Sequence, residues 1–83
     1  MVYEFTLVLA DVPKLTDEIS ERIFAAGCDD ATPHSSGGVT EVDFDRDSDS
    51  LENAIRSAVA QVSAAGYRTA RVEIAGEALS VRS

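Results

Sequence analysis

The spacing of apolar residues predicts a long amphipathic helix over residues 50–66, and the rest of the chain is organised around it. From Leu51 to Val62 apolar side chains recur at helical spacing, which gives this helix a single apolar face. Ser50 supplies an oxygen for the free amides of the first turn, and Gly66 can adopt the left-handed conformation that ends a helix. Such a helix needs a surface to pack on, and we expect strands to provide it.

A shorter helix is predicted between Thr16, which can cap it, and Gly27, which can end it. Its apolar stripe is formed by Leu15, Ile19 and Ile23, joined by Phe24 and Ala26. So short a helix depends on packing against the rest of the protein.

Four other segments are predicted as strands: residues 2–10, 28–32, 39–44 and 68–75, of which residues 28–32 form the weakest. The segment 33–38 combines a proline with two glycines and predicts the loop of a hairpin. In the last strand the alternation places Ala70, Val72 and Ile74 on one side and Thr69, Arg71 and Glu73 on the other.

The predicted order is strand, helix, strand, strand, helix, strand. This order is typical of the ferredoxin-like βαββαβ fold of the α+β class, a four-stranded antiparallel sheet with two helices on one face. Right-handed crossovers give the strand order 4-1-3-2. We expect one domain over residues 1–83, in which residues 77–83 add a short edge strand or fray.

The net charge is −8, from 7 Lys and Arg against 15 Asp and Glu. This acidity repels phosphate backbones, so direct nucleic-acid binding is disfavoured, whereas a basic protein surface would be attracted. Acidity can also serve solubility alone. The sequence has no apolar run near the roughly twenty residues of a membrane span and no secretory signal. Together with a single cysteine, Cys28, this predicts a cytoplasmic protein that does not bind membranes.

The face of the predicted sheet that the helices leave open is the candidate interaction surface. The alternation assigns to it Glu4, Thr6, Val8, Val39, Glu41, Asp43, Arg71 and Glu73, together with Thr69. RNA-binding members of this fold carry aromatic and basic residues on this face. Here the face is acidic and has no aromatic residue, so it indicates a protein partner or a solvated surface.

The acidic segment 43–49 raises the possibility of a calcium loop. Counted from Asp45, the sixth position is Ser50 instead of glycine, and the twelfth is Arg56 instead of glutamate. We therefore interpret the segment as a polar approach to the long helix, and we expect neither a metal nor another cofactor.

Cys28 and His34 are the residues from which a nucleophilic or metal site could be built. A structural zinc site needs about four ligands, and these two residues with nearby carboxylates give no recognised spacing. Acylphosphatases share the predicted fold but need an arginine in a phosphate-binding loop after the first strand. Residues 10–14 are instead acidic and contain Pro13. We expect that the protein is not an enzyme.

Several stretches resemble one family of small bacterial proteins: residues 27–32 (GCDDAT), 43–46 (DFDR), 50–58 (SLENAIRSA), 64–66 (AAG) and 71–73 (RVE). Members of that family are catalogued as DNA-binding or without an assigned function, and the resemblance extends from Tyr3 to Ile74. In longer relatives the last strand continues into a helix-turn-helix, for which residues 76–83 are too few. The resemblance implies a non-enzymatic regulatory or interaction role without the DNA contact of the longer forms.

Our leading hypothesis is a non-catalytic protein–protein interaction or regulatory module, such as an antitoxin or the partner-binding part of a transcriptional regulator. Its partner would be a basic protein, a second copy of the chain, or both. The alternative is a domain that senses a small molecule at a dimer interface.

Overall fold

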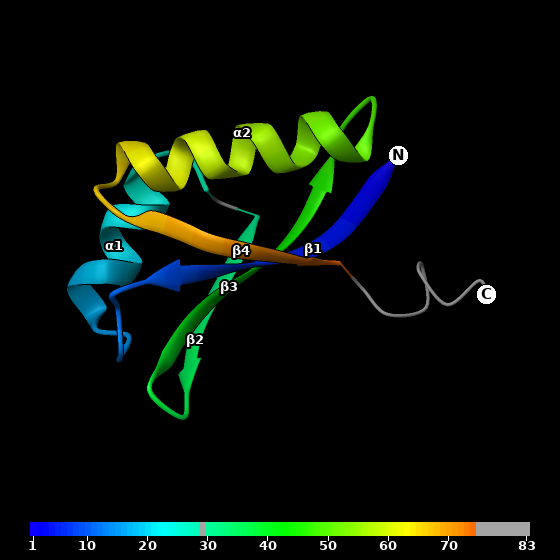
Figure 1. Cartoon of the computed structure of the whole chain (residues 1–83). Helices are drawn as coiled ribbons and strands as arrows, with labels where there is room; N and C mark the ends of the chain where they lie inside the picture. The colour runs from blue at the N-terminus through cyan, green and yellow to red at the C-terminus, as the bar shows by residue number, and fades with distance from the viewer. Residues whose placement is uncertain (29, 75–83) are drawn as a thin grey trace.

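A computed structural model describes residues 1–28 and 30–74 of the chain. Its elements, in chain order, are β1 (Val2–Ala10), α1 (Asp17–Ala25), β2 (Ala31–Ser36), β3 (Val39–Asp47), α2 (Leu51–Ala64) and β4 (Arg68–Ile74). The predicted element order is confirmed (Figure 1). The prediction for residues 77–83, and the extension of the last strand to residue 75, lie outside the described residues.

The strands form one antiparallel sheet in the order β2-β3-β1-β4, which is the predicted order read from the other edge. Both helices pack on the same side of this sheet. Ile23 of α1 and Val62 of α2 belong to one core cluster with the β1 residues Phe5 and Leu7. The fold is therefore the predicted ferredoxin-like arrangement of the α+β class, with one face of the sheet covered by helices.

The buried core explains why β1 and β3 are the central strands. Phe5 and Phe44 are direct cross-strand neighbours, and their rings stack with centroids 5.4 Å apart. Leu7 pairs with Val42 on the same face, and both side chains are fully buried. Each helix is capped as predicted: the hydroxyl of Thr16 accepts from the amide of Ile19, and Ser50 does the same for α2.

The prediction for β2 was wrong in position. The strand covers residues 31–36 instead of 28–32, so most of the predicted loop 33–38 belongs to it. Pro33 is tolerated because β2 is an edge strand, where a missing amide hydrogen breaks no ladder bond on the outer side. Only Gly37 and Gly38 form the turn, and their φ angles of +59° and +81° match the two-residue turn that joins twisted strands.

The end of β3 was also predicted too early. The strand continues through residues 45–47, which pair with Glu4, Tyr3 and Val2 at the start of β1. The acidic segment is therefore largely extended strand. Asp43, Asp45 and Asp47 lie two residues apart on a strand instead of in a metal-binding loop.

A β-bulge changes the predicted alternation in β4. The register shifts so that Arg71 pairs with Val8 whereas Thr69 pairs with Leu9, which leaves Ala70 without a direct partner. Thr69 therefore shares the helix-covered face with Leu9, and its predicted place beside Arg71 was wrong. In the described part of the chain its hydroxyl is buried without a hydrogen-bond partner.

Candidate interaction surface

The sheet face opposite the helices, hereafter the open face, carries polar side chains from all four strands. Direct cross-strand neighbours share a face, so the register defines its members. They are Val2, Glu4, Thr6, Val8, Thr32, His34, Ser36, Val39, Glu41, Asp43, Asp45, Asp47, Arg71 and Glu73. The structure thus brings together on one face every residue of the predicted interaction surface except Thr69. Their role in binding stays a prediction.

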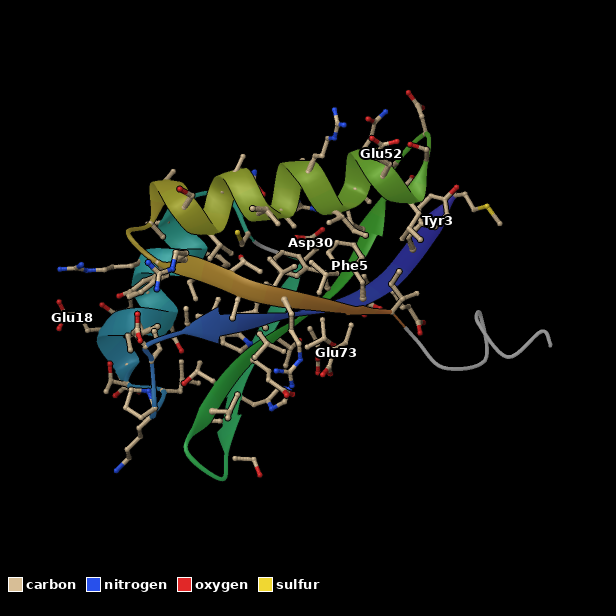
Figure 2. The ribbon with its side chains drawn as sticks, in the orientation of Figure 1. Tyr3, Phe5, Glu18, Asp30, Glu52 and Glu73 are labelled. Carbon is tan, nitrogen blue, oxygen red and sulfur yellow. The ribbon has the colours of Figure 1, made fainter. Side chains whose placement is uncertain are left out.

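Acidic side chains predominate on this face. Carboxylates come from β1, β3 and β4, and the only charged groups opposing them among the face residues are Arg71 and, when protonated, His34. Arg71 is paired with Glu73 of its own strand at 3.1 Å, with both side chains roughly half-exposed. Figure 2 shows Glu73 on the side of the sheet away from α2. The face therefore presents a negative potential to solvent.

His34 lies at the centre of a small polar cluster on β2 and β3. Its Nε2 atom is 3.0 Å from Oδ2 of Asp43 and 3.7 Å from Oε1 of Glu41. The hydroxyl of Thr6 donates to the other Asp43 oxygen at 2.5 Å. Asp43 is thus held from two sides, although these side chains are partly exposed and such contacts contribute modestly to stability.

Sequence reasoning missed the contribution of β2 to this face. Thr32, His34 and Ser36 pair with Asp43, Glu41 and Val39, respectively. The signal available was the alternation of polar residues from Ala31 to Ser36, which the proline and glycines of the same segment obscured.

Val8 is the one fully buried member of the open face, with only 3% of its surface exposed. It lines a hollow of about 530 Å³ together with Val39 and Arg71, at the end of β1 where the chain turns at Asp11. Val8 therefore forms part of the floor of this hollow and offers little apolar area to a partner.

Cys28 and His34 lie on different sides of the sheet. Cys28 is buried in the core, where its thiol donates to Oε1 of Gln61 across 3.7 Å, whereas His34 is on the open face. These two residues therefore do not form a dyad. Cys28 also lines an apolar groove of about 390 Å³ between α1 and β2, beside the exposed ring of Phe24. Within residues 1–28 and 30–74, no group of three or more His, Cys, Asp or Glu residues is arranged to hold a metal ion.

An ion pair on the helix-covered side was also missed from the sequence. Arg46 binds Asp30 through two hydrogen bonds of 2.7 and 2.8 Å, donates to the hydroxyl of Ser57 on α2, and lies 5.0 Å from the centre of the Phe44 ring. The hydrogen bonds from Arg46 lower the pKa of Asp30, and those to Asp30 raise the pKa of Arg46. The pair joins the turn before β2 to β3, Arg46 also contacts α2, and the pair is structural in character.

No helix in the described part of the chain is long and apolar enough to cross a membrane. Comparisons with protein-family models, with curated proteins and with solved structures gave no match to this chain. The open face is therefore interpreted from its own geometry and charge.

Proposed function

We propose that the protein is a non-catalytic interaction module that uses its open face to bind a basic segment of another protein. The observation that carries this proposal is the gathering of Glu4, Glu41, Asp43, Asp45 and Glu73 on one helix-free face. Carboxylates close together on one face of a sheet repel one another, and a cationic partner relieves this repulsion.

The charge of the open face also selects between partners. Nucleic acid would bring further negative charge to a face that already repels it. Two open faces docked directly on one another would oppose carboxylates to carboxylates, which disfavours self-association by this route. A segment rich in Lys or Arg fits, because its cations can reach carboxylates on three strands.

His34 marks the position on the open face where a cationic side chain would compete for an existing contact. Its Nε2 atom is held between Asp43 and Glu41, both of which a cationic side chain would approach. A bound lysine or arginine would therefore compete with the imidazole for the Asp43 carboxylate. The regulatory role implied by the family resemblance is consistent with this chemistry, in which an acidic module masks a basic surface.

The test is a titration with a defined probe, a short Lys- and Arg-rich peptide, read by calorimetry or fluorescence anisotropy. The variant Glu41→Gln/Asp43→Asn removes two carboxylates from the open face. Its matched control, Glu18→Gln/Glu21→Gln, removes the same charge from exposed positions on α1. We expect the open-face variant to weaken binding about fivefold and the control by less than about twofold.

The two variants have the same net charge, so equal weakening would show a general charge effect and would contradict a binding role for the open face. Absence of binding to the unmodified protein at low salt would also refute the proposal. We expect the difference between the variants to disappear at high salt, where the screening length falls to about 3 Å at 1 M.

A further inference from the structure

The two edges of the sheet differ in their capacity to accept another strand. On the β2 edge, Pro33 has no amide hydrogen to donate. The β4 edge, Arg68–Ile74, contains no proline, and no strand among the described residues pairs with its outer side. An edge of this kind presents a row of free backbone donors and acceptors that another strand can satisfy.

We propose that two copies of the chain associate through this edge. Their β4 strands would pair antiparallel about a two-fold axis at Val72, and the two sheets would become one continuous sheet. The strand that pairs with the β4 edge is therefore the β4 strand of a second copy, and the charges along β4 support this choice of partner.

Symmetry leaves few registers. A two-fold axis perpendicular to the sheet keeps both open faces on the same side and places one β4 residue opposite its own counterpart. If that residue is Arg71, two guanidinium groups face each other, and if it is Glu73, two carboxylates do so. If it is Val72, each Arg71 lies opposite Glu73 of the other copy, and the apolar side chains of Val72 meet at the axis. Opposite charges stabilise a direct cross-strand pair and like charges destabilise it, so the Val72 register is the favoured one of these three.

The existing contact between Arg71 and Glu73 makes this arrangement accessible. Their side chains are 62% and 47% exposed and already lie 3.1 Å apart on the open face. Pairing would extend this single ion pair into a two-by-two cluster of alternating charges, two on each β4 strand, without burying an unpaired charge. The two open faces would also join into one larger acidic surface.

The test measures the molar mass in solution by sedimentation equilibrium over a wide range of concentrations. We expect the mass to rise with concentration from the 8.8 kDa of one chain toward twice that value. Either single variant, Arg71→Glu or Glu73→Arg, places like charges opposite each other. Each should therefore weaken dimerisation by roughly tenfold or more. Both positions are exposed, and unchanged far-UV circular dichroism would confirm that each variant is folded.

Two further experiments distinguish this register from a general effect of changed charge on dimerisation. The double variant Arg71→Glu/Glu73→Arg restores opposite charges across the junction and should dimerise like the unmodified chain. An equimolar mixture of the two single variants should also form dimers, because every cross-strand pair in the mixed dimer is complementary. A chain that stays monomeric at all concentrations, or single variants that dimerise as strongly as the unmodified chain, would overturn the proposal. The peptide titration can fail without affecting this measurement, so the two proposals are tested separately.

Discussion

The ion pair between Asp30 and Arg46 is the polar contact whose removal should most affect stability. Replacing Asp30 with Asn removes the negative charge but keeps the size of the side chain. Arg46, of which 11% is exposed, then loses the bidentate contact with a carboxylate, since the new amide offers only one accepting oxygen, and it keeps its contacts with Ser57 and the Phe44 ring. Its charge is left close to the core with less compensation.

The burial of the pair sets the expected magnitude. Exposed ion pairs contribute about 0–1 kcal/mol, whereas breaking a fully buried pair costs about 3–5 kcal/mol. Arg46 is mostly buried and Asp30 is 26% exposed, so we expect Asp30→Asn to lower the free energy of unfolding by about 2 kcal/mol. In a domain of this size that corresponds to a fall in Tm of about 10 °C.

The assay is denaturant unfolding followed by far-UV circular dichroism, applied to Asp30→Asn, Arg46→Gln and the double variant. Arg56→Gln is the matched control, because Arg56 forms an ion pair with Glu52 in which both side chains are largely exposed. We expect the control to change stability by less than about 0.5 kcal/mol. The double variant should lose less free energy of unfolding than the sum of the losses in the two single variants, since the two residues share one interaction. An Asp30→Asn effect as small as that of the control would refute the reasoning.

The same variant has a predictable dependence on pH. The pKa of Asp30 is lowered in the folded state, mainly by its hydrogen bonds from Arg46, relative to about 3.9 in an unfolded chain. The stabilisation is therefore fully present above about pH 4 and is lost as the pH falls through the folded-state pKa. The stability difference between the unmodified protein and Asp30→Asn should shrink below about pH 4, and a constant difference would contradict this linkage.

Denaturant unfolding also checks three simpler predictions. Leu7→Ala should lower the free energy of unfolding by about 2–5 kcal/mol, because Leu7 is fully buried in the core. A decrease below about 1 kcal/mol would mean that Leu7 is not tightly packed. Thr40→Val should raise the free energy of unfolding by about 1 kcal/mol, since in the described structure the buried Thr40 hydroxyl has no hydrogen-bond partner. A lower free energy of unfolding would mean that the hydroxyl does have a partner. Gly66→Ala should lose about 1 kcal/mol because φ is +102°. Gly27→Ala, at the same φ, should lose somewhat more, because its new Cβ would lie 2.9 Å from Nε2 of Gln61; the reverse order would contradict the reasoning.

The element order was predictable because the local patterns agree with one another. Helical spacing over residues 51–62, caps at Thr16 and Ser50, and strand alternation over residues 2–10 all favour the same fold. Most of the open face followed from this alternation. The position of β2 did not, because Pro33 is a turn signal in isolation and becomes acceptable only once the strand is known to be an edge.

Other features depend on register and on tertiary contacts that a single sequence does not contain. The bulge that moves Thr69 to the helix-covered face exists only in the pairing of β4 with β1. The contact between His34 and Asp43 requires β2 and β3 to be aligned correctly. Arg46 lies between aspartates in a polar segment, so the sequence suggests that it is exposed. Its partner Asp30 is sixteen residues away along the chain, and only the folded structure brings the two together.

The position of β1 in the middle of the sheet has a consequence for how the protein folds. β1 is made before the other described strands and pairs with β3 and β4 but not with β2, so both of its neighbours in the sheet are synthesised later than β2. Among the four described strands, only β2 and β3 are both adjacent in the chain and paired in the sheet, and we expect this hairpin to be the earliest stable pairing. Until β4, which ends at Ile74, has been synthesised, β1 has one side without its native neighbour. A stalled or shortened chain would therefore expose its most apolar strand to aggregation.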